Sequence, residues 1–168
     1  MVEYIIGGTV IKALYDGQFA TTCIKNMSTS IYGLLEYIIS NPDNILLNTL
    51  ASLDIEFEVR IMESLISDIK TDEISSVTFN LCLTALKDCV AKIEKELQTI
   101  HKKMQYNNSI YLFKSWRSYP FTNNVNILHT YSNILKKRSK MLFSILKISP
   151  DLISKKSMII RESLILKN

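Results

Sequence analysis

Apolar residues in the middle of the chain recur at alternating spacings of four and three positions. This heptad seam consists of Phe79, Leu83, Leu86, Val90, Ile93, Leu97, Ile100 and Met104. A 3.5-residue repeat places one narrow apolar stripe along a helix that packs against its neighbours at a shallow angle. The pattern therefore predicts a helix over 75–106, with Ser75 or Ser76 as its N-cap and the turn-favouring residues 107–109 at its end.

Apolar residues before the seam also recur at helical spacing. Asn41, Pro42 and Asp43 form the cap, proline and acidic residue that are typical of a helix start, and this helix is expected to run to about Lys70. Its apolar residues widen into two faces, which indicates burial on two sides. In the first 40 residues the helical spacing is interrupted near Gly17, which predicts one bent helix or two short ones.

The chain after the seam begins with an aromatic-rich turn over 110–117, where the lone tryptophan, Trp116, is expected to plug one end of a bundle. A further helix is predicted from a cap at Asn123 or Asn124 to about Lys147, because its apolar residues again recur at spacings of three and four positions. Ser149, Pro150 and Asp151 repeat the helix-start signal and open a final helix.

Composition supports long helices, since the chain has only four glycines and three prolines. We therefore predict an all-α fold: a single helical-bundle domain over 1–168 with five or six helices, in which 1–147 form the bundle and 148–168 a C-terminal helix. No apolar run approaches the roughly 18 residues that span a bilayer, and no signal sequence is recognisable. The three cysteines form no CxxC pair, so we expect reduced thiols and an intracellular, cytoplasmic protein that is at most peripheral to membranes.

Charge is divided unequally along the chain. Residues 1–100 hold 14 acidic and 7 basic side chains, and residues 101–168 hold 2 acidic and 13 basic ones, so the two parts carry −7 and +11. In one interpretation the acidic second helix lies beside the basic run over 136–140. In the other, the basic residues face outward as a patch for an anionic partner. This patch comprises Lys136, Lys137, Arg138, Lys140, Lys155, Lys156 and Arg161.

The partners expected for that patch are an acidic protein face, a second copy of the chain or an anionic lipid surface. Nucleic acid is disfavoured, because the only aromatic residues interleaved with basic ones, such as Tyr111 and Trp116, have helical spacing and are expected in the core.

Residues that could carry catalysis are sparse. His101 and His129 lie in no metal-binding pattern, and neither has a glutamate three residues before it, as di-iron bundles require. Cys82 and Cys89 are one heptad apart, ~10 Å along a helix, which is too far for a disulfide. Glu96 is expected on a solvated face. We therefore expect no enzyme, no catalytic or metal-ligating residue and no cofactor.

Two segments together resemble a known family. Residues 53–57 (LDIEF), then 83–100 (LTALKDCVAKIEKELQTI), precede an aromatic-rich helix break and a basic helix. In this order of elements, over about 1–147, the chain is similar to the HeLo and MLKL-type four-helix bundles. The resemblance implies an N-terminal signalling or membrane-engaging bundle with a helical brace, although no effector domain or long brace follows here.

The sequence thus predicts an adaptor or scaffold that self-associates or binds a partner helix, and whose basic C-terminal patch contacts anionic lipid. The alternative is a structural component of a large assembly, such as a viral particle, in which acidic and basic parts of neighbouring copies meet.

Overall fold

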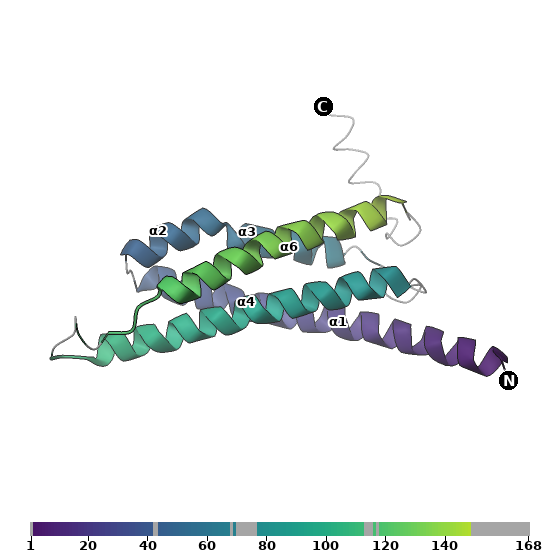
Figure 1. The fold of residues 1–168 in the computed structure, drawn as a ribbon, viewed down its shortest axis with the longest axis horizontal. Coiled ribbons are helices and arrows are strands. Elements are labelled where there is room, and N and C mark those ends of the chain that lie inside the picture. Colours follow the sequence, from purple (N-terminus) through teal and green to yellow (C-terminus); the bar gives the residue numbers. More distant parts are fainter. Residues whose placement is uncertain are drawn as a thin grey trace, which may run out of the picture.

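The computed structural model describes residues 2–41, 44–67, 69, 77–112, 116 and 118–148. Within these ranges the chain forms α-helices and no β-strand, which confirms the all-α prediction. The helices are α1 (Val2–Ser40), α2 (Asn44–Leu53), α3 (Ile55–Ser67), α4 (Val77–Ser109) and α6 (Thr122–Ile148) (Figure 1). The helix predicted over 148–168 falls beyond the described residues after Ile148, as do the predicted caps Ser75 and Ser76.

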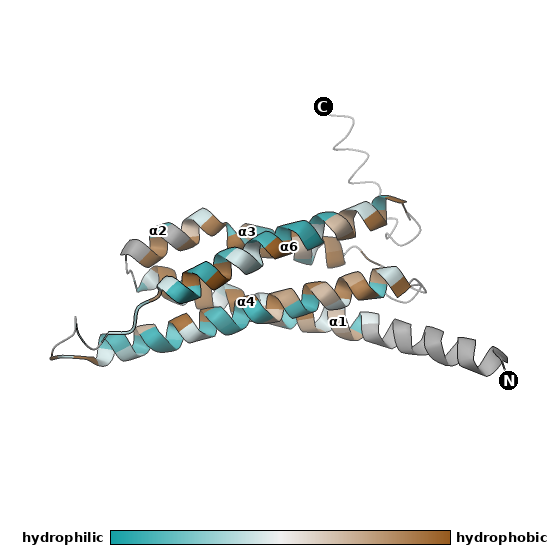
Figure 2. Ribbon diagram, in the orientation of Figure 1, coloured by the Kyte–Doolittle hydropathy of each residue, from teal (hydrophilic) through white to brown (hydrophobic). Residues whose placement is uncertain are grey.

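The predicted central helix is α4, which packs against both α1 and α6 (Figure 1). Every residue of the heptad seam is at most 4 % exposed. The seam is therefore the buried face of α4, as its spacing predicts. Towards its C-terminal end α4 becomes mainly hydrophilic (Figure 2).

The N-terminal region is one helix, so the alternative of two short helices is wrong. Gly17 lies within α1 and is buried against α4, where a Cβ atom would lie 2.6 Å from Oδ1 of Asn80. The glycine interrupts the apolar spacing because it lets the two helices approach closely, and it does not end the helix. The amide of Asn80 is itself buried and has no hydrogen-bond partner among the described residues.

The second predicted helix is broken, contrary to the expectation of one helix from Pro42 to about Lys70. Asp54 separates α2 from α3 and has a φ of 52°, in the left-handed region that aspartate tolerates better than most residues. Its N–H donates to the carbonyl of Ala51 (3.3 Å) and its carbonyl accepts from the N–H of Glu58 (3.1 Å). One residue thus ends one helix and begins the next.

The break lets two apolar residues share a core. Leu53 and Ile55 are both buried, although residues two apart in an unbroken helix point about 200° apart. A tertiary hydrogen bond supports the break, because the buried hydroxyl of Ser132 in α6 donates to the carbonyl of Leu53 (3.0 Å). That carbonyl would otherwise lack a partner at the helix end.

The cap predicted at Asn41 for the second helix serves the preceding helix. Its side-chain amide donates to the carbonyl of Tyr37 (2.9 Å), and its backbone N–H donates to that of Ile38 (3.3 Å). Asn41 therefore satisfies carbonyl groups at the C-terminal end of α1.

The close approach of α1 and α4 predicts opposite effects for two glycines of α1. Gly17→Ala should lower the free energy of unfolding by about 1 kcal/mol, because the new methyl group overlaps Asn80. Gly33→Ala, where a Cβ atom meets nothing within 4 Å, should raise the free energy of unfolding by ~0.5–1 kcal/mol through helix propensity. Urea denaturation followed by circular dichroism measures both.

Asn80→Ala supplies the control for this prediction. In that background Gly17→Ala should become stabilising like Gly33→Ala, because the overlapping amide is gone. A Gly17→Ala variant that is as stable as Gly33→Ala with Asn80 present would show that the two helices have room between them.

Candidate interaction surfaces

The basic run of α6 is divided between two environments. Lys136 extends to α3, where its Nζ lies 3.7 Å from Oε1 of Glu58, and Arg138 donates to the carbonyl of Ala85 in α4. Lys137 and Lys140 are exposed. The three remaining basic residues predicted for the patch, Lys155, Lys156 and Arg161, lie outside the described residues.

Acidic α3 does pack against basic α6, as the first interpretation of the charge division expects. The ion pair of Lys136 with Glu58 spans this contact, but Lys136 is partly exposed, so the pair contributes at most about 1 kcal/mol to stability. The contact also leaves a groove of about 600 Å³ between the two helices. It is lined by Glu58, Ile61, Leu65, Lys136, Ser139, Lys140, Phe143 and Ser144.

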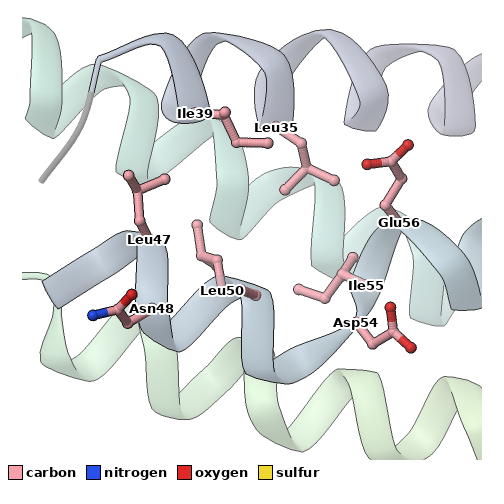
Figure 3. A pocket seen from close by; sticks show the side chains of 9 residues that line it. Leu35, Ile39, Leu47, Asn48, Leu50, Asp54, Ile55 and Glu56 are labelled. Carbon is pink, nitrogen blue, oxygen red and sulfur yellow. The ribbon is translucent and has the colours of Figure 1, made fainter. Parts of the chain in front are cut away.

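A second groove lies between α1 and the broken helix pair (Figure 3). It has a volume of about 310 Å³ and is lined by Leu35, Ile39, Leu47, Asn48, Leu50, Ala51, Asp54, Ile55 and Glu56. The aliphatic side chains of α1 and α2 point toward one another across it. Asp54 and Glu56 both lie at one end, where the carboxylate of Glu56 is on the α1 side and that of Asp54 is on the opposite side of Ile55 (Figure 3). We call this surface the acidic groove.

A polar hollow adjoins the acidic groove and shares Ile39 and Glu56 with it. Arg60 donates to Glu56 (2.7 Å), and this hydrogen bond raises the pKa of the guanidinium. The hydroxyl of Tyr32 donates to Glu63 (2.8 Å). The pKa of this phenol is raised mainly because the side chain is partly buried, and further because the carboxylate of Glu63 accepts its proton in the hydrogen bond. Tyr32 therefore stays protonated at neutral pH and acts as a donor that holds α3 against α1.

The prediction that Trp116 plugs an end of the molecule is wrong. Its side chain is 89 % exposed, and Tyr111 and Leu112 are 95 % and 70 % exposed. Together with the half-exposed Tyr106 and Tyr119 they form what we call the aromatic tip, where the chain leaves α4 and returns to α6 (Figure 1). The helical spacing of these aromatic residues suggested that they lie in the core. The tip, however, projects past the N-terminal end of α6, so this helix does not cover it (Figure 1).

The base of the aromatic tip is held by hydrogen bonds. Asn107 occupies the next position of the heptad seam, three residues after Met104, and is buried. Its amide donates to the carbonyl of Tyr119 (3.1 Å) and accepts from the N–H of the same residue (2.8 Å). The rings of Tyr106 and Tyr119 also contact each other. A polar residue in the seam thus fixes where the returning chain attaches.

A charged network continues this base into α6. Lys103 donates to the carbonyl of Pro120 (3.1 Å) and to Asn124 (2.7 Å), and Asn124 donates to Glu96 (2.9 Å). Asn124 is therefore a buried bridge between α4 and α6, and α6 begins at Thr122, so the predicted cap is wrong. Glu96 is likewise partly buried and bonded, and does not lie on a freely solvated face as predicted.

The histidines and cysteines are placed apart from these surfaces. His101 packs edge-on against Tyr37, with ring centroids 4.2 Å apart, and His129 is exposed. Cys82 and Cys89 are buried packing residues with free thiols, as predicted, and burial raises the pKa of both despite the opposing charge of Arg138. Among the described residues, no three histidine, cysteine or carboxylate side chains cluster as metal ligands would.

None of the described helices has an apolar stretch that is long enough to cross a bilayer.

Asn107 provides a test of the base of the tip. Asn107→Leu should lower the free energy of unfolding by about 1 kcal/mol even though it extends the apolar seam, because both hydrogen bonds to Tyr119 are lost. Hydrogen exchange at the Tyr119 amide should also accelerate. The exposed neighbour Asn108→Leu is the control and should change stability by less than about 0.5 kcal/mol. An unchanged exchange rate in Asn107→Leu would contradict the assigned role.

The chain was compared with protein-family models, with curated proteins and with solved structures, and none of them matches.

Proposed function

We propose that this chain is an intracellular, non-enzymatic helical-bundle protein that self-associates. In this proposal the acidic groove of one copy receives the basic, amphipathic C-terminal segment of a second copy. The segment is the C-terminal helix that the sequence predicts over 148–168. The observation that carries the proposal is the groove itself, an open apolar surface with carboxylates at one end.

The groove has the character of a helix-binding surface. Its aliphatic residues come from two facing elements, and Ile39 on its edge is 59 % exposed. An amphipathic helix buries its apolar face in such a groove through anchors spaced three and four residues apart. The groove has a volume of about 310 Å³, which is at the lower end of the range for small-molecule pockets. A space of this size can hold the side chains of a few such anchors.

The C-terminal sequence supplies the complementary chemistry. Residues 151–168 contain apolar residues at spacings compatible with one helical face, among them Leu152, Ile159 and Ile160, interleaved with Lys155, Lys156 and Arg161. The groove presents Asp54 and Glu56, of which Glu56 also accepts from Arg60, and the adjoining hollow adds Glu36. Opposite charges at the rim would orient the segment and accelerate association more than they would add affinity.

The proposed contact joins two different surfaces, so it is heterologous. Such contacts close into rings or continue into open chains, depending on the rotation between copies. The alternative function, a structural component of a large assembly, uses this same contact repeated through many copies. The acidic and basic parts of the sequence would then meet between neighbours.

Replacement of Ile39 tests the proposal. Ile39→Lys puts a positive charge on the rim of the acidic groove, and should convert a self-associated species to a monomer in light-scattering mass measurements. Lys155→Glu with Lys156→Glu should weaken association in the same way, and raised salt should weaken it in the wild type.

Leu81→Lys is the matched control, because Leu81 is equally apolar, similarly exposed at 65 %, and lies on α4 away from the groove. This variant should associate like the wild type. A wild-type chain that stays monomeric at high concentration, or an Ile39→Lys variant that associates as strongly as Leu81→Lys, would overturn the proposal.

A further inference from the structure

We propose that the aromatic tip docks the protein on an anionic membrane surface by inserting its exposed side chains into the headgroup region. This surface is separate from the acidic groove and from the basic patch of α6. The proposal therefore goes beyond self-association and does not depend on it.

The first observation is the exposure of the tip. Tyr111, Leu112 and Trp116 are each at least 70 % exposed, and they are neighbours in a single connection. Single apolar residues on a surface need no explanation, but three large ones that are exposed within six positions of one connection point to an interaction site. The base of the tip is held by Asn107 and Lys103, which bind Tyr119 and Pro120 where the chain returns to α6.

The second observation is the kind of residues that are exposed. Tryptophan and tyrosine have an apolar body and a polar atom, a combination that favours the boundary between lipid tails and water. Leu112 adds an aliphatic side chain that has no π-face on which a nucleic-acid base could stack. The mixture therefore fits a bilayer interface better than a single-stranded nucleic acid.

The third observation is charge. Between Leu97 and Phe121 the sequence contains no acidic residue, and it contains Lys102, Lys103, Lys114 and Arg117. Lys102 is exposed, whereas Lys103 is held at the base of the tip. Basic residues beside an apolar anchor attract anionic lipids within a Debye length of the surface. The tip thus combines the two attractions that peripheral membrane binding requires.

The position of the tip allows this docking. It lies at the far end of α4 from the chain's N-terminus, and it projects past the start of α6 (Figure 1). A helix of 33 residues extends ~50 Å, so α4 would hold the start of α1 well away from the lipid.

Trp116 is the only tryptophan of the chain, so its fluorescence reports on the tip alone. The full chain would be titrated with vesicles of phosphatidylcholine and with vesicles that also contain phosphatidylserine. We expect a blue shift of emission with the anionic vesicles, little change with the neutral ones, and weaker binding at raised salt. The double variant Tyr111→Ser, Leu112→Ser should bind at least about tenfold more weakly.

The matched control is Val77→Ser with Leu81→Ser, two exposed apolar residues at the other end of α4. This variant, like Ile39→Lys, should bind vesicles as the wild type does, which separates the tip from the acidic groove. Circular dichroism would confirm that each variant is folded. The proposal is overturned if anionic vesicles leave the emission unchanged, or if the tip variant binds as tightly as its control. Quenching by a single-stranded oligonucleotide without any response to vesicles would also overturn it and would assign the tip to nucleic acid.

Discussion

The arrangement depends on one stripe of α4 being buried by two neighbours at once. The heptad seam lies between α1 and α6, and each of its residues is almost fully removed from water. Polar residues stand at both ends of this stripe: Asn80 faces Gly17 at one end, and Asn107 holds Tyr119 at the other. The apolar stripe supplies the stability, while the two amides define how close α1 comes and where the chain returns.

Elements with a long, regular pattern were predictable from sequence, and their interruptions were not. The seam predicted α4 and its buried face, because burial of a heptad stripe follows from helix geometry alone. The break at Asp54 is supported by a hydrogen bond from Ser132 to the carbonyl of Leu53, two residues that are 79 positions apart in sequence. Likewise, Trp116 is exposed because α6 begins too late in the chain to cover it. This is a property of the tertiary structure, which the local spacing of residues does not predict.

The candidate surfaces show the same limit. Counting charges identified the basic run, but successive residues of a helix turn by about 100°, so a run of four basic residues within five positions cannot face one side. Lys136 and Arg138 accordingly contact α3 and α4, while Lys137 and Lys140 face water. The groove between α3 and α6 carries no local sequence signature, since it is lined by residues about 75 positions apart in the chain. The acidic groove is lined by consecutive elements, but it opens only because the chain breaks at Asp54.

The interruption at Asp54 makes the chain unequally tolerant of changes in length. Because α2 and α3 are aligned by separate contacts on either side of that residue, an inserted residue there would not have to rotate α3 relative to its neighbours. The same insertion inside α4 would turn every later seam position by about 100° and carry half of the stripe into water. Homologous chains should therefore vary in length beside Asp54 and keep a constant length from Phe79 to Met104.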